Sequence, residues 1–201
     1  YKGLIDFKPF YFSANFDYEG LSSRNIFNQD AILFDVIQSE ILNNKNLNAN
    51  INLAVKNITN IDELNSLFLK ININQGDIEF SNSNMMWKDD VKIKLKESLL
   101  VFDNNEINLI GKIILDFDNI DDFYKSFQIN KRNRKILKQI KIDFIYNFNQ
   151  NRINFDNVKI DGNSNLNLKK YISNYNSKND SIFNRITFKN FVNNFFKSYS
   201  G

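Results

Sequence analysis

The chain of 201 residues contains neither cysteine nor histidine. It therefore cannot form disulfides, zinc sites built from Cys and His, histidine-ligated haem, or Ser-His-Asp and Cys-His catalytic groups. Catalysis would have to use carboxylates, lysine, tyrosine, serine or a metal held by oxygen ligands. The lack of cysteine does not indicate a compartment, because a cysteine-free chain is equally suited to the cytosol and the periplasm.

Several other residue types are scarce: the chain has 1 Pro, 6 Gly, 4 Ala and 5 Arg, against 37 Asn, 27 Ile and 21 Lys. The abundant residues have A/T-rich codons, so we interpret the asparagine content as the background of an A/T-biased bacterial genome rather than as a low-complexity signal. The net charge is +3 and the pI about 8.9. This mild excess, without a concentrated basic face, predicts no nucleic-acid partner.

Long apolar runs and catalytic motifs are also missing. No stretch approaches the ~18–20 apolar residues of a membrane span. There is no G-x-S-x-G, glycine-rich phosphate loop or H-E-x-x-H, and no carboxylate pair stands out. We therefore expect a protein that is not an enzyme and that holds no metal or cofactor. Because the chain starts at Tyr1 rather than Met, we also expect a fragment whose N-terminal membrane anchor is missing.

Apolar residues alternate with polar ones through most of the chain. This pattern recurs in residues 10–18, 47–55, 67–73, 91–95, 107–117 and 140–148. A period of two is typical of strands with one apolar face, as in antiparallel sheets. A register change between Phe155 and Val158 indicates a β-bulge. The sequence thus predicts a mainly β (α+β) fold, in which a curved antiparallel sheet of hairpins forms an apolar groove.

Helical spacing is confined to a few segments. Residues 32–41, 121–128 and 166–175 read as short helices, and residues 188–199 as an amphipathic helix with an aromatic stripe. We expect that stripe to dock on the sheet. The predicted organisation is a β-rich groove domain at residues 1–162 and a C-terminal helical tail at residues 163–201 that packs on or caps the sheet.

The apolar strand faces are the strongest candidate site. They would form either an ordinary core under helices or a groove that accepts acyl chains, and alternation alone does not separate the two. The short helices offer little area to cover so many one-faced strands, which favours the groove. Its predicted lining is Ile107, Leu109, Ile113, Leu115, Phe117, Ile142, Phe144 and Tyr146.

Two charged segments are further candidates. The basic stretch at residues 131–135 would be a solvated loop, or would contact the phosphates of lipid head groups or of nucleic acid. Its candidate head-group contacts are Lys131, Arg132, Arg134 and Lys135. The acidic residues between Asp116 and Asp122 would bind Ca²⁺ or flank a helix N-terminus. They lack the glycine and distal glutamate of an EF-hand loop, which favours the helix N-terminus.

Residues 67–162 resemble the C-terminal region of the AsmA-like family of Gram-negative envelope proteins. The resemblance is carried by "LFLKININQGDIEFSN", "VKIKLKESLLVFDNNEINLIGKIILDFDNIDDFYKSFQI" and "IKIDFIYNFNQNRINFDNVKIDG". Shared features are a strand ending in a Gly-Asp turn, a hairpin, L-x-G-x-I-x-L-D, a short helix, basic residues and a closing hairpin. It covers about half of the chain and is a pattern of strands, not a catalytic signature.

The resemblance implies a function as well as a fold. Such proteins are similar to bridge-like lipid-transfer proteins, are anchored in the inner membrane and act in outer-membrane biogenesis. We accordingly expect a periplasmic, non-enzymatic segment, tethered to the inner membrane, that binds phospholipid acyl chains in a β-groove and contributes to lipid transport. The alternative is a structural or interaction module of the cell envelope, with a closed core and a protein partner.

Overall fold

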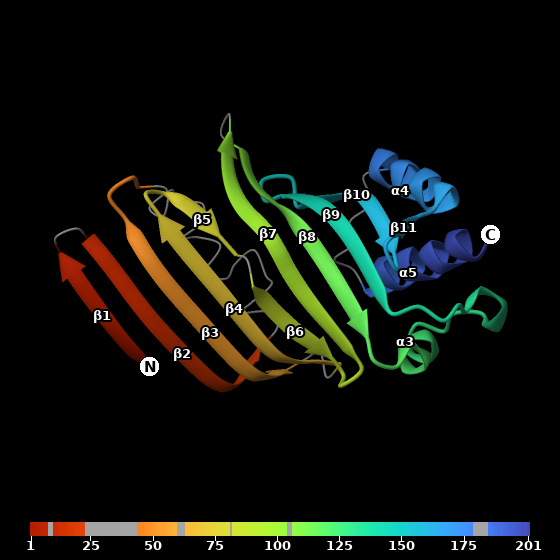
Figure 1. Cartoon of the computed structure of the whole chain (residues 1–201), viewed down its shortest axis with the longest axis horizontal. Helices are drawn as coiled ribbons and strands as arrows, with labels where there is room; N and C mark the ends of the chain where they lie inside the picture. The colour runs from red at the N-terminus through yellow and green to blue at the C-terminus, as the bar shows by residue number, and fades with distance from the viewer. Residues whose placement is uncertain (8–9, 23–43, 60–62, 81, 104–105, 179–184) are drawn as a thin grey trace.

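The structure is a computed structural model that describes residues 1–7, 10–22, 44–59, 63–80, 82–103, 106–178 and 185–201. These residues form a curved sheet of eleven strands, with helices at one end (Figure 1). The strands are β1 (Lys2–Phe7), β2 (Phe10–Ser22), β3 (Asn48–Thr59), β4 (Leu64–Asn74), β5 (Asp77–Glu79), β6 (Ser83–Trp87), β7 (Val91–Asp103), β8 (Glu106–Phe117), β9 (Gln139–Asn147), β10 (Arg152–Ile160) and β11 (Asn163–Ser164). The prediction of a mainly β fold is confirmed.

Neighbouring strands in the sheet are mostly neighbours in the sequence, in the order β1-β2-β3-β4-β5-β7-β8-β9-β10-β11, with β6 pairing β4 and β7. All pairs are antiparallel except β2 and β3, which run parallel from Tyr11↔Asn48 to Ser22↔Thr59. The prediction of a wholly antiparallel sheet is therefore wrong at this one pair. Alternation reports which face a side chain occupies and not the direction of the strand. The helix predicted at 32–41 lies outside the described residues.

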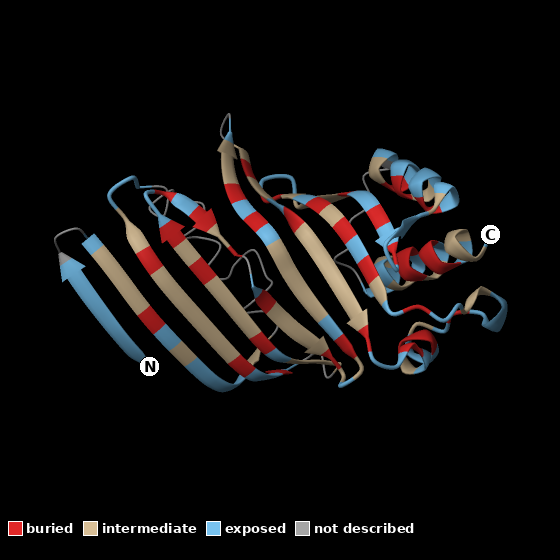
Figure 2. Cartoon of the chain, viewed as in Figure 1, coloured by how far each residue is buried: buried red, intermediate tan, exposed pale blue. Residues whose placement is uncertain are grey.

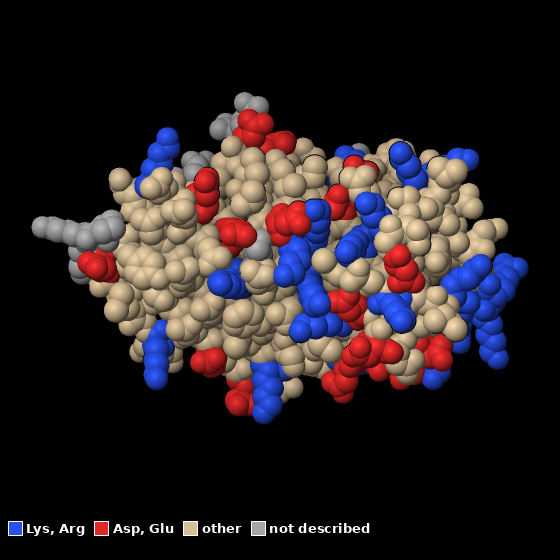
Figure 3. Space-filling model, in the orientation of Figure 1, with Lys and Arg blue, Asp and Glu red and all other residues tan. Residues whose placement is uncertain are grey.

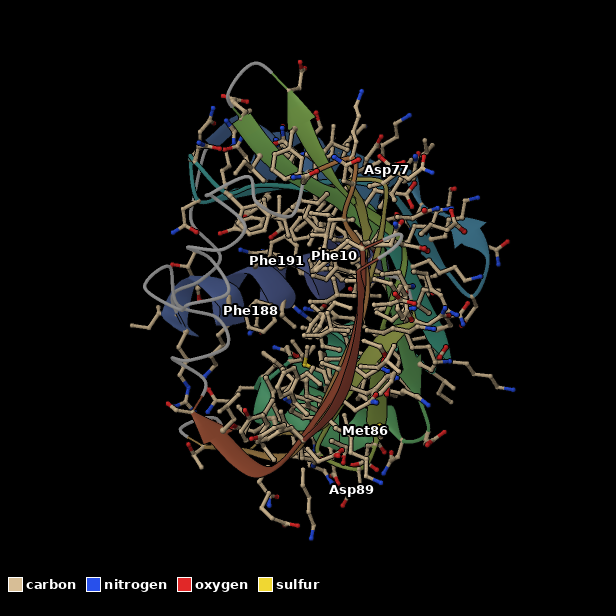
Figure 4. All side chains as sticks on the ribbon, turned by 90° about the vertical axis from the view of Figure 1, so that its left-hand side faces the viewer. Phe10, Asp77, Met86, Asp89, Phe188 and Phe191 are labelled. Carbon is tan, nitrogen blue, oxygen red and sulfur yellow. The ribbon has the colours of Figure 1, made fainter. Side chains whose placement is uncertain are left out.

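The register places the alternating apolar residues on one face. Ile113 lies opposite Ile142, and Leu109 opposite Tyr146. The other face is mostly polar, as the 2.7 Å hydrogen bond from Asn50 Nδ2 to the Tyr11 hydroxyl illustrates, although the exposed side chains of Leu99, Ile110 and Ile145 lie side by side on it. We call the apolar side, toward which the sheet is concave and on which α5 lies, the inner face. Figure 4 shows the two sides, one of carbon and the other tipped with nitrogen and oxygen.

Register shifts interrupt three strand pairs, β9–β10, β7–β8 and β4–β6, the last between Asn65 and Phe68. The predicted bulge in β10 is confirmed by a register shift between Asp156 and Lys159. A second bulge in β7, at Glu97 with φ 48°, was not predicted. It brings the buried Ser98 against Gly111 so closely that a Cβ at Gly111 would overlap the Ser98 side chain. Bulges increase local twist and bend the strand, which suits a curved sheet.

Helices pack at the β8–β10 end. The short helix α3 (Ile120–Ser126) begins after Asn119, whose side chain accepts a 3.1 Å hydrogen bond from the Asp121 backbone N–H. It is followed by the 3-10 turn η2 (Lys131–Asn133) and, after β11, by α4 (Leu166–Lys178) and α5 (Arg185–Ser200). Because β11 belongs to the sheet, the sheet itself continues past residue 162, and the predicted division there stays a prediction.

Helix α5 has the predicted aromatic stripe. Phe191, Phe195 and Phe196 are buried, and the ring of Phe191 lies 5.2 Å from that of Phe155 on β10. Bands of buried residues cross the strands and continue onto the helices (Figure 2). A single cluster of buried side chains thus joins the helices to the inner face at this end of the molecule.

Candidate functional site

The inner face carries no charged side chain between β7 and β10. On β8, it consists of the alternate residues from Ile107 to Phe117, and on β9 of those from Ile140 to Tyr146. On β10, it continues through Phe155 to Ile160. Charged residues of the same strands point to the outer face instead, where Lys94 contacts Asp116 at 2.5 Å. An uncharged face of this extent suits an apolar ligand or an apolar cover.

All eight residues predicted to line a groove lie on this face, and they fall into two groups. Ile107, Phe117, Ile142 and Phe144 are buried, whereas Leu109, Ile113, Leu115 and Tyr146 are half-buried. The first group resembles a closed core. The second group keeps part of its apolar surface in contact with solvent, in the middle of the sheet.

The buried group is explained in part by the helices. Phe117 packs edge-on against Phe123 of α3, with ring centroids 5.4 Å apart. Phe123 in turn contacts Trp87 of β6 at 5.0 Å. Phe144 and Ile142 belong to the same buried cluster as α4 and α5. At this end the inner face is covered by the protein itself.

The N-terminal half of the inner face differs. Two further buried clusters, around Ile71 and around Val55, contain only strand and loop residues among those that the structure describes, and the first extends to Leu100, Ile107 and Phe148. Large side chains between them, including Phe12, Ile51 and Leu69, are half-buried. Apolar surface therefore extends across the sheet well beyond the area that α3, α4 and α5 cover.

Ionisable groups near the inner face are kept neutral. Burial raises the pKa of Tyr124 to about 12, and its hydroxyl donates a 2.6 Å hydrogen bond to the Lys135 carbonyl oxygen. Burial also raises the pKa of Tyr146, whose hydroxyl donates to Asn151 Oδ1 at 2.9 Å. Both phenols are uncharged at physiological pH, and the hydroxyl groups of Tyr146 and of the buried Ser98 are polar groups on a face that is mainly apolar.

Two of the acidic residues in this segment, Asp116 and Asp122, form ion pairs within the protein. Burial opposes ionisation of Asp116, but its hydrogen bond from Gln139 and its ion pair with Lys94 outweigh this effect and lower its pKa. Asp122 pairs with Lys125 at 2.8 Å. No group of three or more acidic side chains within the described ranges is placed to hold a metal ion.

The four predicted head-group contacts lie together beyond α3. Lys131 and Arg132 belong to η2, and Arg134 and Lys135 follow it. All are exposed except Arg134, which is half-buried and donates from Nε to the Ile129 carbonyl oxygen at 3.0 Å. Lys and Arg side chains gather at this end of the molecule in Figure 3. The sequence did not single out Ile136, which follows them and is 96% exposed.

A hollow of about 990 Å³ lies on the outer face, between α4 and strands β8–β10. Its walls hold three acidic and three basic residues, so it favours neither sign of charge. Asn154 Oδ1 lies buried in the wall without a hydrogen-bond partner among the described residues. The hollow adjoins the polar side of the sheet, and Phe144, Phe155 and Val158 of the inner face also contribute to its lining.

No protein-family model, curated protein or solved structure matches this chain. None of the helices in the described ranges combines the length and apolarity needed to cross a bilayer. The resemblance to AsmA-like proteins thus stays a prediction. The features of this chain that bear on function are the inner face and the charged end of the molecule.

Proposed function

We propose that the inner face binds the acyl chains of phospholipid and that the protein is a non-enzymatic segment of a cell-envelope lipid-transport system. One observation carries the proposal: an uncharged apolar face runs across the sheet, and its central side chains remain half-buried. Leu109, Ile113 and Leu115 of β8 lie in this central part. An ordinary core of this kind would be expected to bury them.

The energetics need no specific polar contacts. Each methylene group that leaves water for an apolar face contributes about 0.8 kcal/mol. A face without charges accepts an acyl chain with no desolvation cost for ionised groups. The head group would remain in water, and the assignment of Lys131, Arg132, Arg134 and Lys135 to head groups is part of this proposal.

The first experiment is purification of the chain without detergent, followed by native mass spectrometry and lipid extraction. We expect phospholipid to accompany the folded protein in near-stoichiometric amount. A clean mass of the protein alone, with cooperative unfolding, would instead indicate a closed core.

A pair of adjacent substitutions sharpens this test. Leu109 is half-buried on the inner face, whereas Ile110 is 40% exposed on the outer face. Leu109→Asp should abolish lipid loading and leave the circular dichroism spectrum unchanged, while Ile110→Asp should retain lipid. If Leu109→Asp unfolds the protein and the parent chain carries no lipid, Leu109 belongs to a closed core and the proposal fails.

The alternative is an interaction module of the envelope, and β1 supports it. This strand forms one edge of the sheet, and Leu4 and Ile5 are 59% and 55% exposed. An exposed edge strand is a template for pairing with another strand. Capture of a β-rich envelope partner by a lipid-free chain, lost in Leu4→Pro, would favour this function over lipid binding.

The cellular setting is proposed from the sequence resemblance. We propose a periplasmic location, with a tether to the inner membrane in the full-length protein and a role in outer-membrane biogenesis. Fractionation of the native host would test this: the protein should be accessible to protease in spheroplasts and should sediment with inner membranes. Recovery in the cytosolic fraction would exclude the setting while leaving lipid binding itself open to the preceding test.

A further inference from the structure

The loop between α3 and β9 presents an exposed isoleucine among basic side chains. Ile136 is 96% exposed, and Lys131, Arg132 and Lys135 beside it are exposed as well. We define these four residues as the basic tip. Residues 123–142, which contain it, hold seven lysines and arginines and no acidic residue.

The basic tip is held in place by hydrogen bonds on both sides. The Tyr124 hydroxyl donates to the Lys135 carbonyl oxygen and accepts from the Lys135 backbone N–H at 3.2 Å. The Ser200 hydroxyl of α5 donates to Asn133 Oδ1 at 3.0 Å. Because the backbone is fixed next to it, the exposure of Ile136 follows from the fold.

The basic tip is also held in place by buried residues on either side of it. Leu137, the next residue, is 3% exposed, and Ile129, which precedes η2, is 1% exposed. Two apolar anchors thus fasten the loop to the core, and the one apolar side chain between them points into solvent. Removal of the Ile136 side chain should leave the core intact, because this side chain does not pack against the core.

We propose that the basic tip docks on the surface of an anionic lipid bilayer, with Ile136 inserted at the acyl boundary and Lys131, Arg132 and Lys135 against the head groups. An apolar side chain gains free energy only where it leaves water, and the cations gain only near negative charge. An anionic membrane surface provides both at one depth. Nucleic acid or an acidic peptide would satisfy the cations and leave Ile136 in water.

This inference shares Lys131, Arg132 and Lys135 with the proposed function, which places them at the head group of a bound lipid, but it does not depend on acyl-chain binding by the inner face. It concerns an intact bilayer rather than a single lipid molecule. A variant such as Leu109→Asp should lose bound phospholipid and still associate with vesicles. The two proposals therefore fail separately.

The test is flotation of the full chain with vesicles of phosphatidylcholine alone, or with about one-third phosphatidylglycerol, at low and high salt. We expect binding only to the anionic vesicles, and weaker binding at high salt. Each lysine or arginine near such a surface contributes about five-fold to partitioning. The double variant Lys131→Gln/Arg132→Gln should therefore bind about 25-fold less tightly.

The isoleucine is tested with a matched control elsewhere on the surface. Leu166, at the start of α4, is 78% exposed and lies outside the tip. Ile136→Glu should reduce vesicle binding at least ten-fold, and Leu166→Glu should not change it. Equal binding by Ile136→Glu and the parent chain would overturn the proposal, as would equal binding to neutral vesicles.

Tryptophan fluorescence measures directly how deeply the side chain at position 136 enters the bilayer. The only tryptophan, Trp87, is buried, so it provides a constant background. In Ile136→Trp, the emission should shift to shorter wavelength with anionic vesicles and be quenched by brominated acyl chains, whereas Leu166→Trp should show neither change. A different result would identify the tip as a nucleic-acid surface. In that case the chain would not bind vesicles, and it would bind single-stranded oligonucleotides with an affinity that falls in Lys131→Gln/Arg132→Gln and is unchanged in Ile136→Glu.

Discussion

The two ends of the sheet bury their inner faces in different ways. At β8–β10, helices α3, α4 and α5 pack on the strands and form one cluster in which aromatic rings meet at 4.5–6.3 Å. The two described clusters that include β3 and β4 are smaller and contain strand and loop residues only, one of them reaching Leu100 and Ile107. The same alternation in the sequence therefore supports a helix-covered core at one end and, among the described residues, an apolar face without a packed helix at the other.

Alternation therefore defines which face of a strand is apolar but does not determine what covers that face. Phe155 on β10 and Phe12 on β2 both occupy apolar positions of alternating strands. Phe155 is buried beneath Phe191, whereas Phe12 is half-buried. What separates them is a helix supplied from another part of the chain.

The largest expected effect tests the helix-covered end. Phe196 is 1% exposed, and its ring lies 5.0 Å from Tyr124 in an edge-to-face arrangement. Phe196→Ala should lower the free energy of unfolding by about 3–5 kcal/mol because it leaves a cavity. Urea denaturation followed by Trp87 fluorescence measures the loss.

The control lies on the same helix. Phe188 is 41% exposed, so Phe188→Ala should lower the free energy of unfolding by no more than about 1 kcal/mol. Similar losses in the two variants would mean that α5 does not form the core of this end.

A second prediction concerns the bulge between the two regions. Gly111→Ala should destabilise the protein by about 1–3 kcal/mol, because the new methyl group overlaps the Ser98 side chain. Adding Ser98→Gly should recover part of this loss, with a coupling of about 0.5–3 kcal/mol in a double-mutant cycle of urea midpoints. If the changes in the free energy of unfolding of the two single variants simply added up in the double variant, Gly111 and Ser98 would not be in contact.

The third prediction uses the raised pKa of Tyr124. The folded state holds the phenol proton up to about pH 12, whereas the unfolded chain loses it near pH 10. The pKa shift of Tyr124 therefore contributes fully to the free energy of unfolding below pH 10. This contribution falls by about 1.4 kcal/mol per pH unit between pH 10 and 12. Tyr124→Phe should be less stable at pH 8 but should lose less stability than the parent chain from pH 9.5 to 11.5, as measured by urea midpoints. Parallel profiles would contradict the assigned burial.

The smallest effect belongs to the opposite end. Leu4→Lys on the edge strand β1 should change the free energy of unfolding by less than about 0.5 kcal/mol, because the side chain is exposed. It should nevertheless reduce self-association at high concentration, since a charged edge disfavours strand pairing. Light scattering with Leu166→Lys as the control separates an edge effect from a general effect of charge.

Much of this fold could be predicted from the sequence because each strand has one apolar face. The strand at 107–117, the bulge after Phe155 and the aromatic stripe of residues 188–199 followed from local periodicity. The parallel pairing of β2 and β3 did not, because strand direction depends on a connection that leaves no mark on alternation. The β7 bulge was also missed, since Glu97 and Ser98 lack the glycine that commonly signals one.

The candidate site was predictable to a similar degree. Alternation placed all eight lining residues on one face, but it could not divide them into buried and half-buried groups, because that division depends on α3, α4 and α5. At the basic tip, Ile136 and Leu137 are adjacent and both apolar. Only the hydrogen bonds of Tyr124 to Lys135 determine which of them turns outward.

The parallel pairing of β2 with β3 has a consequence for the kinetics of folding. Contacts across it, such as the 2.8 Å hydrogen bond from Asn52 to Asn15, join residues 37 positions apart, whereas the two strands of β9–β10 meet around a short turn. Closing a longer loop is entropically slower, so the β1–β2 pair should join the sheet late. During synthesis this pair leaves the ribosome before β3 exists, and until β3 arrives the edge of β2 that β3 will occupy is open to chaperones.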